Sequence, residues 1–343
     1  MYLRCNDACY VEDKLYMSAC NMNGLFSIDV KTRELKFITH FPQESRLCLD
    51  LHSKVISKEN TLYFIPLNGT GISVVHLPEC LFTHIASEVK FVNALMYKDS
   101  IYLIPYQLVD GIWKYLIGEN VLVKTDLNVF GQELDRNNDS ITDWYGSLII
   151  DDYLYIVISG TGNISKVNLL TGESMLIKFE GVQFANIYYY KEWFYITDNK
   201  YSYLYKTKMK KNDIVKIKIP GEEKTRAIYR VVDYNNSIIC IPCFGDTIYQ
   251  YYPDNDNFQI LYSIQSSEYI DCCQTKYAGT TIAEEKLLLL PKGDFRIIEL
   301  GTESSASYEF YFNDFFDVET KCSRNIMLYE NKTLDVADYI RII

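Results

Sequence analysis

The chain has 343 residues, of which 45 are acidic and 34 basic, so its formal net charge is −11. A chain this acidic repels phosphate backbones, and we expect no nucleic-acid partner. Hydrophobic residues make up 48 % and aromatic residues 15 %, which excludes a disordered chain. The 30 tyrosines, together with many isoleucines, favour β-strands.

A short apolar pair recurs along the chain at spacings of 47, 39, 53, 40, 44 and 49 residues. Spacings of this size are typical of one blade of a β-propeller. The seven copies are Leu15-Tyr16, Leu62-Tyr63, Ile101-Tyr102, Leu154-Tyr155, Phe194-Tyr195, Ile238-Ile239 and Leu287-Leu288.

A polar two-residue turn precedes each pair, as in Glu12-Asp13, Asp151-Asp152 and Asn235-Asn236. Asp and Asn tolerate the left-handed backbone of tight hairpins, so each turn predicts two antiparallel strands. The first strands of the first five copies are expected at residues 8–11, 54–56, 95–97, 148–150 and 187–190.

Proline marks the end of the second strand in four copies, because it lacks the N–H that a central strand needs. These residues are Pro66, Pro105, Pro242 and Pro291. A Gly-, Asn- or Asp-rich loop follows, and then alternating third strands such as residues 25–29, 164–168 and 247–251. Fourth strands are expected at residues 35–39 and 174–179.

Four antiparallel strands repeated without intervening helices must close into a ring so that each sheet buries both faces. The sequence therefore predicts an all-β fold, a β-propeller of seven four-stranded blades, with six or eight blades as alternatives. We expect residues 1–318 to form this single domain. Residues 319–343 are expected to add a closing strand and a C-terminal helix from Thr333 that packs on the propeller or docks a partner.

The pattern Leu154-Tyr155 followed by Asn168-x-x-Thr171-Gly172-Glu173 resembles the repeat of quinoprotein-like and kelch-like bacterial propellers. The resemblance covers residues 7 to about 313 and implies a fold, because such folds host sugar oxidation, lyase chemistry and pure binding alike. Quinone-binding members carry a regular tryptophan in each blade. This chain has three tryptophans, at different repeat positions, so we expect no quinone and no other cofactor.

Residues 1–7 show neither the apolar run nor the small-residue cleavage site of a signal peptide. No stretch approaches 18 consecutive apolar residues, and we expect no membrane insertion. Ten cysteines without an export signal predict reduced thiols and a bacterial cytoplasmic location.

Ligands of propellers approach the channel mouth, where the loops after the second strands meet the loops that join successive blades. Four cations fall on these joining loops, and together they would attract an anionic ligand; alternatively, each pairs with a neighbouring carboxylate such as Glu44. They are Arg46, Lys90, Arg226 and Lys276.

Four aromatic residues map to the same mouth and would stack on a sugar, with capping of the core as the alternative. They are Tyr106, Trp144, Phe184 and Phe244. Together with Arg46, Arg226 and Lys276, they form the predicted ligand-binding set.

Metal and catalytic signatures are weak. The four histidines, His40, His52, His76 and His84, lack a metal-binding spacing and all fall in the first two blades. Residues 135–139 have the alternating oxygens of a calcium loop but lack its glycine and its final glutamate. Cys240 and Cys243 are three apart on a strand and so point to opposite faces. We therefore predict no metal site and no catalytic residue.

A regular repeat without an assembled catalytic set favours a non-catalytic binding or scaffolding propeller. Its loop face would bind a protein partner or a glycan-like ligand. The alternative is a carbohydrate-active enzyme, a glycoside hydrolase or a lyase, with two carboxylates at the channel mouth.

Overall fold

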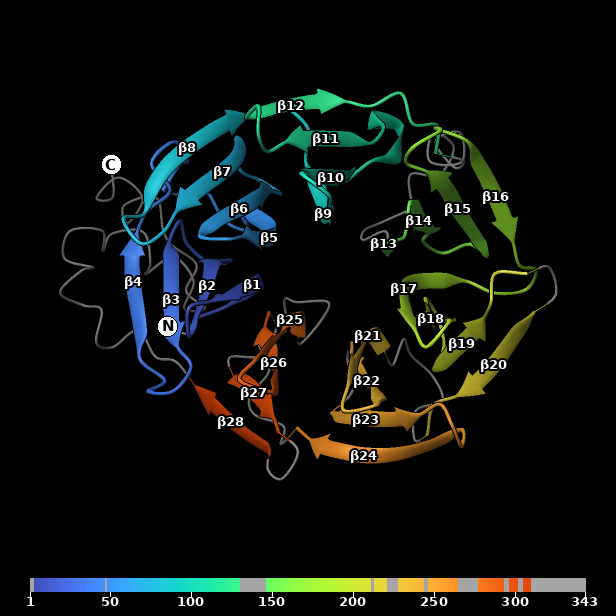
Figure 1. The fold of residues 1–343 in the computed structure, drawn as a ribbon. Coiled ribbons are helices and arrows are strands. Elements are labelled where there is room, and N and C mark those ends of the chain that lie inside the picture. Colours follow the sequence, from blue (N-terminus) through green and yellow to red (C-terminus); the bar gives the residue numbers. More distant parts are fainter. Residues whose placement is uncertain are drawn as a thin grey trace, which may run out of the picture.

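The computed structural model describes residues 3–46, 48–129, 146–210, 213–220, 228–243, 246–264, 277–292, 296–301 and 305–309. These residues form seven four-stranded antiparallel sheets arranged as blades around a common axis (Figure 1). The structure confirms the seven-bladed propeller expected from the sequence. The predicted closing strand and C-terminal helix lie outside the described residues.

Each blade runs from the axis outward in chain order, so that its first strand is innermost and its fourth strand is outermost (Figure 1). The inner strands are β1 (Cys5–Val11), β5 (His52–Lys58), β9 (Phe91–Tyr97), β13 (Ser147–Ile150), β17 (Phe184–Tyr190), β21 (Ile228–Tyr234) and β25 (Tyr277–Ala283). The second strands are β2 (Lys14–Ala19), β6 (Thr61–Pro66), β10 (Ser100–Pro105), β14 (Tyr153–Ile158), β18 (Trp193–Asp198), β22 (Ser237–Pro242) and β26 (Lys286–Pro291).

The third strands are β3 (Leu25–Asp29), β7 (Gly71–His76), β11 (Trp113–Leu116), β15 (Asn163–Asn168), β19 (Tyr203–Thr207), β23 (Thr247–Tyr252) and β27 (Arg296–Leu300). The outer strands are β4 (Leu35–Thr39), β8 (Leu81–Ala86), β12 (Val121–Lys124), β16 (Ser174–Lys178), β20 (Ile214–Lys218), β24 (Asn257–Ser263) and β28 (Ser305–Glu309). The described helical structure is one 3-10 turn, η1 (Leu108–Asp110), and none of it is long and apolar enough to cross a membrane.

The prolines and the apolar pairs lie at the positions predicted from the repeat. The four prolines are each the last residue of a second strand. The apolar pairs lie on the second strands, and both members are buried in every copy. Because second strands are central in their sheets, these pairs fill the space between neighbouring blades.

The motif Asn168-x-x-Thr171-Gly172-Glu173 closes the hairpin between β15 and β16. Asn168 Oδ1 accepts the backbone N–H groups of Leu170 and Thr171, and Gly172 has a φ of 75°. Blade 1 repeats this geometry with Asp29, whose Oδ1 accepts the N–H of Thr32. The motif is therefore a side-chain-capped turn.

The hairpin turns between first and second strands hold left-handed residues. The first residue of each of the seven turns has a φ between 46° and 53°, and five of these residues are Glu or Lys rather than Asn, Asp or Gly. A left-handed backbone is unfavourable for such side chains. The fold, rather than local preference, therefore fixes these turns.

Substitution of Glu59 tests this strain, because Glu59 is exposed and has a φ of 52°. We expect Glu59→Asn to raise the free energy of unfolding by about 0.5–1 kcal/mol, since Asn tolerates the left-handed region. Urea denaturation measures the change. Glu79→Asn, at an exposed turn residue without a positive φ, is the control, and an equal gain there would argue against relief of strain.

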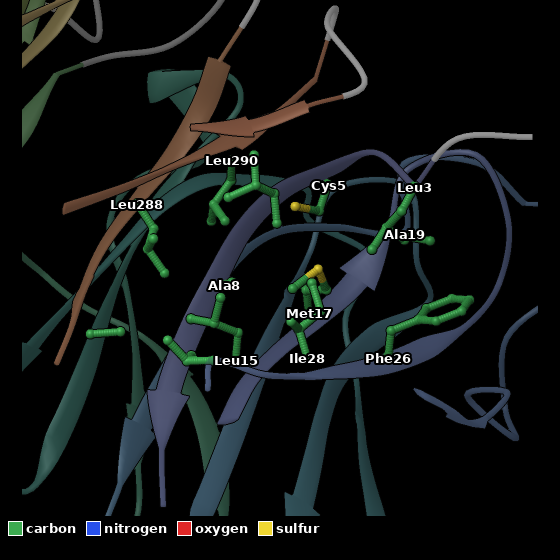
Figure 2. Close-up of a cluster of buried hydrophobic side chains, with 13 residues drawn as sticks. Leu3, Cys5, Ala8, Leu15, Met17, Ala19, Phe26, Ile28, Leu288 and Leu290 are labelled. Atoms are coloured by element: carbon green, nitrogen blue, oxygen red, sulfur yellow. The ribbon is translucent and has the colours of Figure 1, made fainter. Parts of the chain in front are cut away.

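Among the described strands, no sheet contains strands from both blade 7 and blade 1, which meet where the ring closes. Figure 2 shows Leu288 and Leu290 of β26 beside Cys5, Ala8 and Leu15 of blade 1, all in one buried cluster. Lys31 adds an ion pair to Glu284, 3.1 Å between Nζ and Oε1. Because exposed ion pairs contribute little, apolar packing dominates this closure.

Candidate functional site

Seven equivalent positions form a ring around the axis, four residues before the last residue of each inner strand. They lie near the ends of the inner strands at which the joining loops enter the blades. We call this end of the propeller the loop face. We call this set the inner ring; it consists of Asp7, Lys54, Asn93, Gly146, Asn186, Arg230 and Gly279. The five members with polar side chains are partly buried as whole residues, and the side chain of Asp7 is only 8 % exposed.

A break in strand pairing accompanies the inner ring. In six blades the register between first and second strands shifts beside the ring residue. Such bulges interrupt the ladder and redirect side chains, and they are frequent next to binding sites. The bulge also explains why the predicted inner strands were too short at their N-terminal ends.

Two ring members link neighbouring blades. Asp7 Oδ2 lies 3.4 Å from Lys54 Nζ and accepts the backbone N–H of Val55 at 3.3 Å. Asn93 Nδ2 donates to Ser147 Oγ at 2.8 Å. These bonds connect blade 1 to blade 2 and blade 3 to blade 4. The carboxylate of Asp7 also neutralises the charge of Lys54.

Arg230 differs from the other charged ring members. Its guanidinium carbon lies 5.2 Å from the centre of the Tyr229 ring, and its Nε is buried without a hydrogen-bond partner among the described residues. On the neighbouring inner strand, Asn186 Oδ1 accepts the backbone N–H of Ile187 at 2.8 Å.

Buried polar side chains fix the loops of blades 1 and 2. Asn23 Nδ2 donates to the carbonyls of Phe41 and Glu44, both at 3.1 Å, and Asn23 Oδ1 accepts the N–H of Phe41. The Glu44 carboxylate accepts the N–H of Thr70 at 2.8 Å. The loop that joins these blades is thus clamped from both sides.

In blade 5 a buried carboxylate shapes the loop after the second strand. Asp198 accepts the N–H groups of Lys200 and Tyr201, at 2.7 and 2.6 Å, and the hydroxyl of Tyr205 at 2.6 Å. Burial, and then Asp198, raise the pKa of Tyr205. The loop displays Tyr201, which is 46 % exposed, on the loop face.

Three residues of the predicted ligand-binding set are described. Tyr106 is 38 % exposed on the loop face and Arg46 is exposed, whereas Phe184 is fully buried. Phe184 packs against Phe179 and Tyr205 between blades 4 and 5, so it caps the core as the alternative expected and is not available for stacking. Trp144, Arg226, Phe244 and Lys276 lie outside the described residues.

The expected pairing of the loop cations with nearby carboxylates is not seen at the described positions. Glu44 bonds Thr70 rather than Arg46, and Lys90 Nζ donates to Asn68 Oδ1 at 3.1 Å. Tyr201 was missed because it lies outside the markers of the repeat. The sequence feature that indicates this loop is Asp198, which takes the place of the proline at the end of the second strand and is suited to capping a turn.

The histidines do not assemble a metal site, and the described residues contain no group of three metal-ligating side chains. His52 Nδ1 lies 2.9 Å from Ser18 Oγ, and its Nε2 is buried without a hydrogen-bond partner in the described part of the chain. Burial, and then nearby His84, lower the pKa of His52 to about 3. His76 is exposed and bonds Thr61. His52 is therefore a neutral residue between blades 1 and 2.

Cysteines 240 and 243 are both buried, as are Cys5 and Cys20, and Cys5, Cys20 and Cys240 are free thiols. Burial raises the pKa of Cys240 to about 12. Burial, and then Asp50, raise the pKa of Cys20. The thiols of Cys20 and Cys240 are therefore protonated at neutral pH and lack the thiolate that nucleophilic chemistry requires.

The opposite end of the ring, which we call the turn face, uses its side chains in bonds between blades. Tyr97 donates to Asp152, Tyr188 donates to Asp233, and Tyr234 donates to the carbonyl of Glu285. Ion pairs join further blades, including Lys58 to Asp99 and Lys191 to Asp254. The turn face is therefore stabilised by its own residues.

No protein-family model and no curated protein matches the chain in sequence. Solved structures match its fold. The computationally designed Ika8 protein is similar over 90 % of this chain and 97 % of its own, with a TM-score of 0.57 and 10 % identity.

Two larger bacterial proteins contain a similar propeller. The extracellular domain of the hybrid two-component system BT4673 from B. thetaiotaomicron matches 88 % of this chain, with a TM-score of 0.61 and 14 % identity. PorZ, a surface component of the type-IX secretion system of Porphyromonas gingivalis, matches 91 %, with a TM-score of 0.60 and 11 % identity. This chain spans 38 % of the length of each. At these identities the likeness concerns the fold.

Proposed function

We propose that the protein is a binding propeller that takes its ligand on the loop face. The difference between the two faces carries this proposal. Many turn-face side chains bond between blades, and on the loop face Asp7 and Asn93 do the same. The loop face also presents Asn186 and Arg230, whose side chains make no bond between blades among the described residues, and two exposed tyrosines, Tyr106 and Tyr201.

The fixed geometry of the described loops of blades 1, 2 and 5 supports this role. Asp198 holds the loop that displays Tyr201, and Asn23 and Glu44 hold the neighbouring loops of blades 1 and 2. A pre-ordered surface loses little conformational entropy when it binds. Side chains held in this way suit recognition of a ligand.

A glycan-like ligand suits the loop face better than a protein partner. The large hydrophobic residues that are exposed on its described part are the two tyrosines, without an aliphatic anchor. Protein interfaces are built around apolar anchors in a desolvated centre. Two separate tyrosines above a polar ring offer flat faces and hydrogen-bonding groups for sugar rings.

We also keep two finer predictions within this proposal. The first is a relationship to kelch-like or quinoprotein-like propellers, supported by the side-chain-capped turn at Asn168. The second is a cytoplasmic location, supported by the free thiols of Cys5, Cys20 and Cys240, although two similar structures are an extracellular domain and a surface component.

Screening the purified chain on a glycan array, followed by titration of the best ligand, tests the proposed function. We expect Tyr106→Ala combined with Tyr201→Ala to weaken binding by about tenfold or more, since an aromatic anchor is worth at least 1.4 kcal/mol. Leu170→Ala, at an exposed turn-face residue, is the control. If the control lost binding and the double variant did not, the binding site would lie on the turn face, and the proposed function would be wrong about its location.

A further inference from the structure

Arg230 is the cation of the inner ring that has no counter-charge among the described residues. Lys54 is neutralised by Asp7, 3.4 Å away. No carboxylate among the described residues pairs with Arg230, whose Nε is buried and without a hydrogen-bond partner there. An arginine retained in this state at the surface of an acidic chain attracts an anion from solution.

The ring positions on either side of Arg230 carry no charge. Blade 7 contributes Gly279, which has no side chain, and blade 5 contributes Asn186. Asn186 Oδ1 accepts the backbone N–H of Ile187. The two N–H groups of its Nδ2 have no acceptor among the described residues. Arg230 and Asn186 hold equivalent positions on the neighbouring strands β21 and β17, and a guanidinium fork together with an amide donor suits the planar geometry of a carboxylate.

We propose that the inner ring recognises the carboxylate of an acidic glycan, such as a uronic-acid unit, through Arg230 and Asn186. This inference rests on the proposed function and adds that the ligand is negatively charged. The sugar ring lies toward the tyrosines of the loop face, and its carboxylate enters the inner ring at blades 5 and 6. The ion pair between Asp7 and Lys54 keeps the opposite side of the ring neutral.

Calorimetric titration with a trimer of galacturonic acid, compared with the neutral galactose trimer of the same linkage, tests the charge. We expect the acidic trimer to bind at least tenfold more tightly. Arg230→Gln is expected to reduce its affinity to that of the neutral trimer, because a charge-assisted hydrogen bond is lost. Arg230→Lys keeps the charge without the fork and is expected to retain part of the preference.

Lys98→Gln makes the same charge change on the turn face and is expected to alter affinity less than twofold. Circular dichroism and urea midpoints verify that each variant is folded. Equal binding of the two trimers, or an unchanged preference in Arg230→Gln, overturns the acidic-glycan inference but leaves the proposed function standing.

Preferential binding of galactose 6-phosphate or of an acidic peptide, with the acidic trimer inactive, also overturns the inference. Absence of binding to every sugar overturns it together with the glycan part of the proposed function.

Discussion

Gly279→Ala is expected to lower the free energy of unfolding by about 2–3 kcal/mol, as overpacking at a rigid contact does. A Cβ at residue 279 would lie 2.8 Å from the Cα of Asp7 and 2.9 Å from the carbonyl oxygen of Asn6. Both atoms belong to the backbone of β1, so the clash is relieved only if blades 1 and 7 move apart. Urea denaturation followed by tyrosine fluorescence measures the loss.

Two further glycines provide the comparison. At Gly146 a Cβ would lie 2.4 Å from the Cα of Asn186, so Gly146→Ala tests the same backbone contact between blades 4 and 5. At Gly118 a Cβ would meet nothing within 4 Å, and Gly118→Ala is expected to be neutral. A loss in Gly118→Ala equal to that in Gly279→Ala would mean that backbone freedom, and not the contact, sets the cost.

The two glycine contacts differ in how the chain holds them. Blades 4 and 5 are consecutive in the chain, whereas blades 7 and 1 come from its two ends and share no described sheet. A clash at Gly279 therefore loosens a contact held by packing and by ion pairs such as that between Lys31 and Glu284. We expect hydrogen exchange in Gly279→Ala to rise first in β1 and β25, and in Gly146→Ala to rise in β13 and β17.

The repeat could be predicted because its markers report local physics. A proline that ends a strand and a buried apolar pair each follow from the geometry of a strand within a few residues. Pro66 and Pro291 lie at the strand ends for this reason. Seven copies of such markers were sufficient to give the architecture.

The site was harder to predict because it depends on contacts between blades. Phe184 lies at the start of an inner strand, beside the register shift, so strand alternation does not say which way it points. Gly279 appears unremarkable until β1 is placed against it. The proposed role of Arg230 depends on its neighbours in the inner ring. These neighbours, such as Asn186, lie about 45 residues away in the chain.

Acid is expected to destabilise the protein through His52, whose pKa is lowered to about 3 in the fold, chiefly by burial and then by His84. The unfolded chain takes up a proton near pH 6.5, and the folded chain does so only near pH 3. Between these values the free energy of unfolding falls as the pH falls, by up to about 1.4 kcal/mol per pH unit. From pH 7 to pH 5, His52 therefore costs about 2 kcal/mol.

His52→Asn removes the titrating group and keeps a polar atom within reach of Ser18 Oγ, which lies 2.9 Å from the Nδ1 of His52. Although this variant is expected to be less stable at pH 7, because Phe41 and Phe64 lose a packed ring, its stability should fall less between pH 7 and pH 5. Urea midpoints at both pH values give the difference. His76→Gln, at an exposed histidine, should behave as the parent protein does. If His52→Asn showed the same pH dependence as the parent, the acid sensitivity would arise from other groups, and His52 would not be held neutral by its burial between blades 1 and 2.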